Sequence, residues 1–291
     1  MHHAVVDGKS FFIFMKSWAH ICRSLGSGDD QLPLELKPAY DRSYINDPAD
    51  LGTIFSNRWL NMDGPDNRSL LPWKRLSTVQ SDAVRGTFQL PRGEIEKLKR
   101  LVNDQKHCPD IHVSTFSVTY AYTFIRLVKA EEISDNKVLL RIGMDFRSRL
   151  DPALPATYFG NCLGGTFAVV EREALLGKGG LFVVVNAISE AIKGLGKGLL
   201  DRAENWVPSS IDVFKTLPKR YGVSSSPRFA AYNTDFGWGK PTKVEVTSIR
   251  SGTMSLSDNR NGDGGVEIGL VLRKHHMKAF ASLFAEGLES L

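Results

Sequence analysis

The sequence predicts a protein of the α/β or α+β class, because strand-like and helix-like segments alternate along the chain. Runs rich in β-branched residues are separated by segments whose apolar residues recur three and four positions apart. Hydrophobic residues make up 42% of the chain and charged residues 24%, a composition that excludes a disordered polypeptide. The 291 residues allow one large domain or two of ordinary size.

The first predicted element is a helix over residues 9–24. Its apolar residues lie nearly all round the helix axis, which indicates that the helix is buried. From Leu32 to about Trp73, five prolines interrupt the pattern. A stretch this long without regular structure is typical of a connection between domains, so we interpret it as a crossover linker.

The segments after this linker alternate between strand and helix. Pro91 opens a charged helix, the spacing of Phe116 and Tyr120 gives the next helix an apolar face, and residues 261–264 supply a turn before the last strand. Strands are predicted at residues 86–90, 138–144, 165–170, 228–233, 243–247, 253–256 and 266–272, and helices at 91–102, 114–129, 181–195 and a closing helix that contains 277–288.

Charge and cysteine content narrow the class of protein. The net charge is +5, which suits a polyanionic small ligand as well as it suits nucleic acid. The three cysteines, Cys22, Cys108 and Cys162, cannot form a disulfide framework, so we expect a reducing compartment and a cytoplasmic protein. No apolar run approaches the length of about 18 residues that a membrane span needs, and none is predicted.

The first candidate for chemistry is His3-x-x-x-Asp7-Gly8, just before the predicted helix 9–24. If Asp7 fixes the geometry of this loop, His3 can project into a cavity as a general base. A more ordinary interpretation is a turn in which Asp7 caps the helix. The motif alone does not separate the two.

The second candidate is the pentapeptide Asp235-Phe236-Gly237-Trp238-Gly239. Its two glycines and a Trp near an acid indicate a packed turn. It offers no obvious catalyst, because Trp donates only one hydrogen bond. We therefore assign the motif a structural role.

Together the two motifs resemble the signatures of the plant BAHD acyltransferases, coenzyme A-dependent enzymes that acylate hydroxyls and amines. Condensation domains and chloramphenicol acetyltransferases share the first motif but lack the second. Residues 145–150 (Asp-Phe-Arg-Ser-Arg-Leu) and 158–162 (Tyr-Phe-Gly-Asn-Cys) resemble the clade that acylates sugars on anthocyanins, flavonoids and phenolic glucosides. Members of that clade mostly use malonyl-CoA, and some use hydroxycinnamoyl-CoA. The resemblance runs over the whole chain.

The resemblance implies a chloramphenicol acetyltransferase-like fold of two α/β domains with the active site between them. Residues 1–45 would be the end of the first domain, most of which would be missing from an N-terminally truncated chain. Residues 46–73 would be the crossover linker and 74–291 the second domain. The segment from about 240 to 260 would return to the sheet of the first domain.

The resemblance also implies roles for individual residues. His3 would take the proton from a sugar hydroxyl, and Asp7 would pair with Arg147 and so fix the loop that carries His3. Asn161 would order the wall of the pocket. Ser224 and Ser225 align with the segment that faces the acceptor, although a solvated loop is an equal alternative for them.

Three further expectations concern the reaction. No Gly-x-Ser-x-Gly nucleophile elbow is present, so direct transfer is favoured over an acyl-enzyme. Cys162 is interpreted as a small buried hydrophobe. His275 and His276 have no Cys or His at ligand spacing, so no metal is expected.

The function expected from all of this is an acyl-CoA-dependent O-acyltransferase that moves a malonyl or hydroxycinnamoyl group to a sugar hydroxyl of a phenolic, flavonoid or anthocyanin glucoside. Its partners would be an acyl-CoA co-substrate, malonyl-CoA first, and the glycoside acceptor, with no nucleic acid and no membrane, and the chain would be a monomer. One alternative is a BAHD enzyme with another alcohol or an amine as acceptor. Another is a catalytically inactive truncated fragment.

Overall fold

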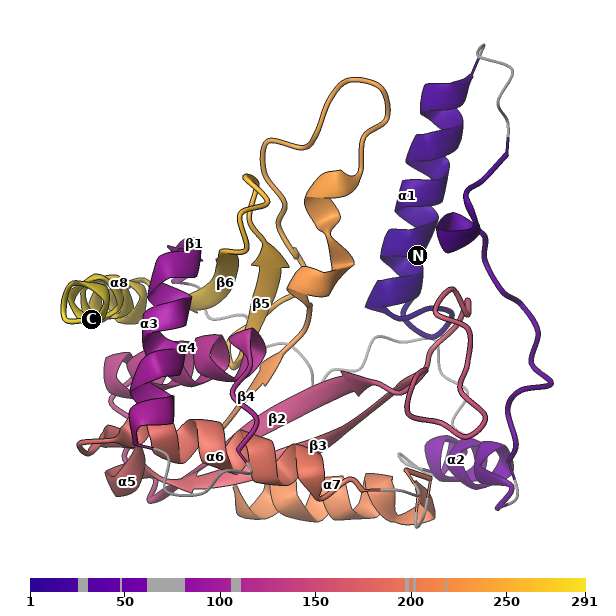
Figure 1. Cartoon of the computed structure of the whole chain (residues 1–291). Helices are drawn as coiled ribbons and strands as arrows, with labels where there is room; N and C mark the ends of the chain where they lie inside the picture. Colours follow the sequence, from indigo (N-terminus) through magenta and orange to yellow (C-terminus); the bar gives the residue numbers. More distant parts are fainter. Residues whose placement is uncertain are drawn as a thin grey trace.

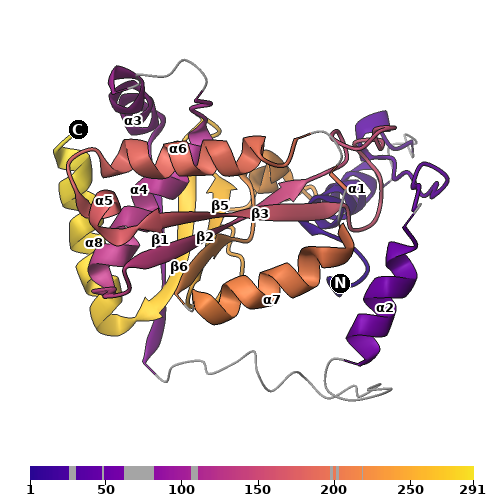
Figure 2. The same cartoon turned by 90° about the horizontal axis from the view of Figure 1, so that it is seen from below.

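The fold is built on one mixed sheet of six strands in the order β1-β6-β5-β4-β2-β3 (Figure 1). It is seen in a computed structural model that describes residues 1–25, 31–47, 49–61, 82–105, 111–196, 199–200, 203–217 and 219–291. The pairs β1–β6, β5–β6 and β2–β3 are antiparallel, whereas β2–β4 and β4–β5 are parallel. Helices cover the sheet from both sides, with α6 and α7 on opposite faces of β3 (Figure 2).

Strands and helices of the described residues have the following bounds. The strands are β1 (Ala83–Leu90), β2 (Lys137–Asp145), β3 (Leu163–Glu171), β4 (Arg220–Val223), β5 (Thr253–Asp258) and β6 (Val266–Arg273). The helices are α1 (Gly8–Ser24), α2 (Leu51–Leu60), α3 (Arg92–Asp104), α4 (Thr115–Ala130), α5 (Arg172–Leu176), α6 (Gly180–Lys193), α7 (Trp206–Thr216) and α8 (Lys274–Glu289). Short 3₁₀ helices lie at η1 (Leu34–Leu36), η3 (Ala203–Asn205), η4 (Pro227–Phe229) and η5 (Ala231–Asn233).

The main core lies between the sheet and helix α4. Ser114 opens this helix with a reciprocal capping box to Ser117, which satisfies two of the backbone donors that a helix start leaves free. Nearly all of the side chains that follow are buried. The hydroxyl of Tyr120 bonds to the backbone carbonyl of Tyr221 at 2.9 Å and so ties α4 to β4. Burial raises the pKa of this phenol far above its usual range, so Tyr120 stays neutral.

Most predicted elements are confirmed, but two predicted strands are wrong. Residues 228–233 form the 3₁₀ turns η4 and η5 instead of a strand, because Pro227 starts a turn and Ala230 has a left-handed backbone with φ of 46°. Residues 243–247 join no strand ladder. The carbonyls of Val246 and Thr247 instead accept hydrogen bonds from the guanidinium of Arg85, at 2.8 and 2.9 Å.

The predicted all-round burial of the first helix is also wrong. In α1 only Ser10, Ser17 and Ala19 are buried, whereas Trp18 is 50% exposed and Ile21 is 45% exposed. Figure 1 shows the reason: α1 stands beside the sheet and does not lie on it. Its small residues face the rest of the protein, and several of its large apolar residues face outward.

The predicted crossover region differs in part from the structure. Residues 51–60 form helix α2, and residues 62–73 lie outside the described part of the chain. Strand β5 belongs to the same sheet as β4 and β6, which differs from the expected return of residues 240–260 to another sheet. The proposed boundary at residue 74 stays a prediction.

Within the described residues, no helix has both the length and the hydropathy of a membrane span.

Two glycines in the β2–β3 hairpin provide a matched test of this packing. A Cβ on Gly164 would overlap the ring of Phe146, whereas a Cβ on Gly143 would meet nothing within 4 Å. We expect Gly164→Ala to lower the free energy of unfolding by about 1–3 kcal/mol through overpacking. Gly143→Ala should leave it unchanged or raise it by up to about 1 kcal/mol. Urea denaturation of both variants checks the difference, and equal losses would contradict this packing.

Candidate functional site

Asp7 organises the loop that leads into α1. Its backbone is extended, and its Oδ1 accepts a hydrogen bond from the backbone N–H of Ser10 at 2.9 Å, so it is the N-cap of the helix. Asp7 as a whole residue is only 1% exposed. Its second oxygen, Oδ2, accepts the backbone N–H of Cys162 at 3.0 Å. One carboxylate therefore joins the start of α1 to the segment just before β3.

A buried ion pair joins this carboxylate to Arg147. Nη2 of Arg147 lies 2.8 Å from Oδ2 of Asp7, and the two side chains are 1% and 0% exposed. Taking two charges out of water is costly unless the remaining donors and lone pairs are satisfied. Arg147 meets that requirement, because it also donates to the carbonyls of Tyr158 and Gly160 at 3.1 and 2.9 Å. The ordinary interpretation, a helix cap, and the charge pair are thus both present in Asp7.

Ser10 is a further member of this buried network. Its hydroxyl accepts a hydrogen bond from Nη2 of Arg147 at 3.0 Å and lies 3.0 Å from the carbonyl oxygen of Gly160, to which it donates. The backbone N–H of Gly160 also donates to it, at 3.1 Å. Sequence analysis missed this residue. Its position three residues after the capping Asp7 is the one signal that could have found it.

A second carboxylate balances the charge of the cluster. Asp145 lies 2.8 Å from Nη1 of Arg147 and 2.9 Å from Nζ of Lys9 on α1. Burial acts to raise the pKa of Asp145, but the hydrogen bonds from Lys9 and Arg147 hold it below its usual value. The cluster therefore contains two cations and two anions, and Asp145 stays ionised at neutral pH.

His3 lies at the exposed end of the loop. Its backbone carbonyl accepts a hydrogen bond from Nδ2 of Asn161 at 2.7 Å, and the backbone turns between His2 and Val5. Its imidazole is exposed and makes no hydrogen bond to any residue in the described ranges. The backbone of His3 is thus anchored, while the ring remains available to another molecule.

The pentapeptide at 235–239 forms a turn beside the C-terminal half of α1. Oδ1 of Asp235 accepts the backbone N–H groups of Gly237 and Gly239 at 2.8 and 2.9 Å, and these bonds, that from Gly237 foremost, lower the pKa of this carboxyl. Both glycines have a positive φ, of 105° and 96°, which a side chain would oppose. The expected packed turn is wrong for Trp238, which is 92% exposed. The ring of Phe236 instead contacts Trp18 of α1.

Comparison with protein families gives a match over residues 1–286 to the model of the Transferase family. The chain belongs to this family, the BAHD acyltransferases.

Several curated relatives support the assignment to the BAHD family. The chain is 37% identical over 297 residues to malonyl-CoA:anthocyanidin 5-O-glucoside-6''-O-malonyltransferase of Arabidopsis thaliana, covering 99% of this chain and 64% of that protein. It is 33% identical over 309 residues to phenolic glucoside malonyltransferase 1 and 34% identical over 290 residues to agmatine coumaroyltransferase, both from Arabidopsis thaliana. Those alignments cover 99% and 97% of this chain. The chain spans 64% and 63% of these two relatives.

Solved structures confirm the predicted BAHD fold. Vinorine synthase superposes with a TM-score of 0.66 at 21% identity, covering 97% of this chain and 60% of that one. TRI101 of F. sporotrichioides, in complex with coenzyme A and T-2, gives a TM-score of 0.61 at 15% identity, covering 96% and 62%. At these identities the likeness establishes the fold alone.

The serines of this BAHD chain are engaged with the sheet. Oγ of Ser225 lies 2.7 Å from the carbonyl oxygen of Leu256 and also accepts that residue's N–H at 2.9 Å. Ser224 donates to the carbonyl of Met254 at 3.3 Å. Both hydroxyls thus hold the end of β4 against β5. The structure brings His3, Asp7, Arg147 and Asn161 together, and it places the serines and the pentapeptide elsewhere.

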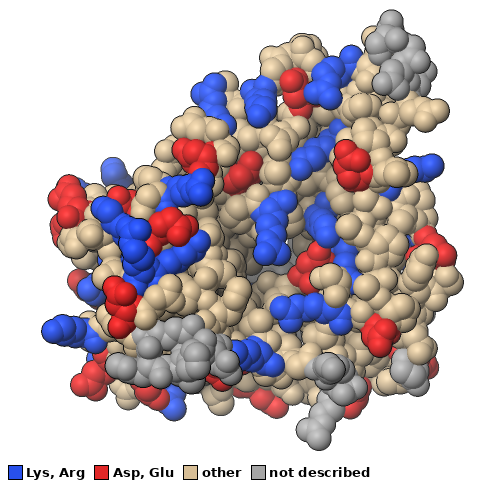
Figure 3. All heavy atoms as spheres, viewed as in Figure 1, with Lys and Arg blue, Asp and Glu red and all other residues tan. Residues whose placement is uncertain are grey.

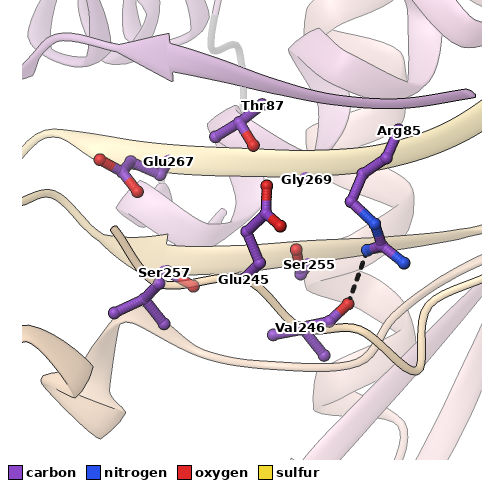
Figure 4. Close-up of a pocket in the computed structure, with 9 residues that line it drawn as sticks. Arg85, Thr87, Glu245, Val246, Ser255, Ser257, Glu267 and Gly269 are labelled. Atoms are coloured by element: carbon purple, nitrogen blue, oxygen red, sulfur yellow. Dashed lines mark hydrogen bonds between the residues drawn. The ribbon is translucent and has the colours of Figure 1, made fainter. Parts of the chain in front are cut away.

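Two hollows lie apart from the loop of His3, since neither is lined by His3, Asp7 or Arg147. An open groove of about 300 Å³ lies between α1 and residues 233–235, with Lys16, His20 and Arg23 along its helical side. A second cavity, of about 10 Å³, lies under residues 244–246 (Figure 4) and is about the size of one water molecule. Figure 3 shows Lys and Arg side chains gathered around a hollowed region near the middle of one face. In the described ranges, no three His, Cys, Asp or Glu residues group as metal ligands would.

Cys162 fits its interpretation as a small hydrophobe. It is 9% exposed and packs in a small cluster with Phe146, Leu154 and Tyr158. Burial raises the pKa of its thiol. A thiol held neutral in this way is a poor nucleophile.

Removing Asp7 should damage the fold, and removing the side chain of His3 should not. Asp7→Ala leaves the guanidinium of Arg147 without its buried partner, which should lower the free energy of unfolding by about 3–5 kcal/mol. His3→Ala removes an exposed ring and should change it by less than about 0.5 kcal/mol. Thermal unfolding followed by circular dichroism checks both, and equal melting temperatures for Asp7→Ala and the parent would contradict the account.

Trp238 should contribute little to stability, because almost all of its ring is in solvent. We expect Trp238→Ala to change the free energy of unfolding by less than about 0.5 kcal/mol. Phe236→Ala should cost more, since that ring contacts α1. Chemical denaturation of the two variants ranks them, and a larger loss for Trp238→Ala would show that its ring is packed.

Proposed function

We propose that this chain transfers a malonyl group from malonyl-CoA to a sugar hydroxyl of a phenolic, flavonoid or anthocyanin glucoside, with His3 as the general base. The observation that carries the proposal is the exposed imidazole at the end of a loop fixed by a buried ion pair, Arg147 to Asp7 at 2.8 Å. A loop fixed in this way can hold a base in one geometry, which is what proton transfer in the transition state requires.

The reaction follows from the chemistry of these groups. His3 takes the proton from the sugar hydroxyl while the oxygen attacks the thioester carbonyl, and a tetrahedral intermediate forms. The C–S bond then breaks, and the imidazolium returns the proton to the leaving thiolate of coenzyme A. The products are the malonyl ester and free coenzyme A. General base catalysis of this kind contributes about 10²–10⁴-fold.

Direct transfer is favoured over a covalent acyl-enzyme. Cys162 lies near the loop, but it is buried and its thiol pKa is raised, so it is a poor nucleophile. The hydroxyl of Ser10 is fully buried and hydrogen-bonded within the ion-pair network. Both substrates would therefore be bound together when transfer occurs.

The donor and acceptor are inferred from charge and from relatives. Coenzyme A carries several negative phosphate charges, which suit the net charge of +5 and the Lys and Arg side chains around the hollow in Figure 3. Two of the relatives named above transfer malonyl groups to glucosides, as their names state. The same proposal takes the chain to act as a cytoplasmic monomer.

A second candidate is transfer of a hydroxycinnamoyl group to an amine. Its support is the 34% identity to agmatine coumaroyltransferase. The general base would take the proton from a neutral amine as its nitrogen attacks the thioester carbonyl, so the site geometry near His3 does not oppose it.

Incubation of the chain with malonyl-CoA and a simple phenolic glucoside tests the proposal. We expect a malonyl ester by mass spectrometry and release of free coenzyme A, and no ester on the aglycone, which lacks the sugar. His3→Ala should lower turnover by about 10²–10⁴-fold while the melting temperature is unchanged. A product formed only from coumaroyl-CoA and agmatine would favour the second candidate, and undiminished turnover in His3→Ala would refute the assigned base.

A further inference from the structure

One row of residues on α1 contacts Phe229, which is far from the helix in sequence. Gly8, Phe12 and Lys16 are spaced by four residues, so they lie in one row along the helix. All three contact Phe229, the last residue of η4. We infer that Phe229 is a positioning residue, which sets the place of the first turn of α1 and through it the place of His3.

The three contacts differ in kind. The ring of Phe12 stacks on the ring of Phe229 with centroids 5.3 Å apart and an interplanar angle of 27°. Nζ of Lys16 donates to the backbone carbonyl of Phe229 at 2.6 Å. At Gly8, an added Cβ would lie 2.9 Å from Cε2 of the Phe229 ring. The ring therefore occupies the space that a side chain at position 8 would need.

Phe229 is itself fixed to the sheet. Ser226 caps η4 by accepting the backbone N–H of Arg228, and Ala230 closes the turn in a left-handed conformation. The next residue, Ala231, donates its N–H to Oδ1 of Asp258 at 2.9 Å, and Asp258 ends β5. Since α1 does not lie on the sheet, this turn links the helix to β5: Ala231 is bonded to Asp258 of β5, and Phe229 contacts α1.

The contacts of Phe229 with Gly8, Phe12 and Lys16, which we call the Phe229 clamp, lie next to the candidate site. Gly8 directly follows Asp7, whose Oδ1 receives a hydrogen bond from Ser10 of the same helical turn. Arg147 thus holds this turn from the side of β2, and Phe229 holds it from the side of β5. Position 8 is a glycine because the ring of Phe229 occupies the space that a side chain there would need.

The effect on turnover rests on the proposed function, whereas the contact itself can be tested without it. A combined Gly8 and Phe229 experiment separates the two. Ala is a better helix former than Gly, so any loss in Gly8→Ala comes from its surroundings. We expect Gly8→Ala to lower the melting temperature and kcat in the parent. In a Phe229→Ala background the same change should alter kcat by less than about twofold, because the ring is gone.

Phe229→Ala alone should lower kcat on the order of 10²-fold, as expected for a displaced base, with KM for malonyl-CoA within about twofold. Phe229→Leu, which keeps part of the apolar bulk without adding an atom beyond Cζ next to Gly8, should recover part of the loss. Phe214→Ala is the matched control, because its ring packs on Phe167 of β3. It should lower stability and leave kcat and the effect of Gly8→Ala unchanged.

The imidazole signal of His3 in ¹H–¹³C NMR, assigned by its loss in His3→Gln, supplies a readout that needs no turnover. It should shift in Gly8→Ala and Phe229→Ala and stay in place in Phe214→Ala. Additive effects of Gly8→Ala and Phe229→Ala on the melting temperature, or a His3 signal that does not move, would overturn the inference. If the signal moves but no variant and no parent turns over substrate, the clamp is supported and the proposed function fails.

Discussion

The buried pair between Asp7 and Arg147 is the interaction on which the candidate site depends. It joins three segments that are distant in sequence: the loop that carries His3, the end of β2, and the stretch around Gly160 that leads into β3. A pair without solvent is tolerated only where hydrogen bonds satisfy both ions. Here the backbone N–H groups of Ser10 and Cys162 complete the carboxylate, and carbonyls complete the guanidinium. The network therefore holds these three segments together, and a single substitution in it can separate them.

This ion-pair network matters because α1 does not pack on the sheet. A helix packed on a sheet is positioned by many apolar contacts, but the buried positions of α1 are small residues. Its place is set by a few directed contacts near its start. Lys9 and Ser10 meet the β2–β3 side, and Gly8 and Phe12 meet Phe229. The side chain of the base proposed at His3 is exposed, while its backbone carbonyl accepts a hydrogen bond from Asn161.

The sequence allowed much of the sheet and its helices to be predicted, because apolar residues recur along them at the spacing of a strand or of a helix. The buried β2 and β6 strands and the apolar face of α8 show this plainly. Residues 228–233 misled because their apolar and aromatic residues are typical of a strand, while Pro227 and the left-handed Ala230 close two turns there. The exposure of Trp18 could not be predicted either, since an all-round apolar pattern reports composition and not what lies beside the helix.

The candidate site could be predicted only in part. The motif around His3 and Asp7 was visible, but its partner Arg147 lies 140 residues further along, and resemblance to a family supplied it. Ser10 and Phe229 were missed because each acts through one side chain, and a single side chain does not form a repeating pattern in the sequence. Their roles arise from where the chain returns in space, which single-sequence patterns do not contain.

A double-mutant cycle on the buried pair tests the central claim most directly. It compares the free energies of unfolding of the parent, Asp7→Ala, Arg147→Met and the double variant. If the pair holds the loop as a unit, the double variant will lose less free energy of unfolding than the sum of the two single losses, by a coupling free energy of about 1–3 kcal/mol. Losses that simply add would show that the two residues act separately, and the loop would then need another anchor.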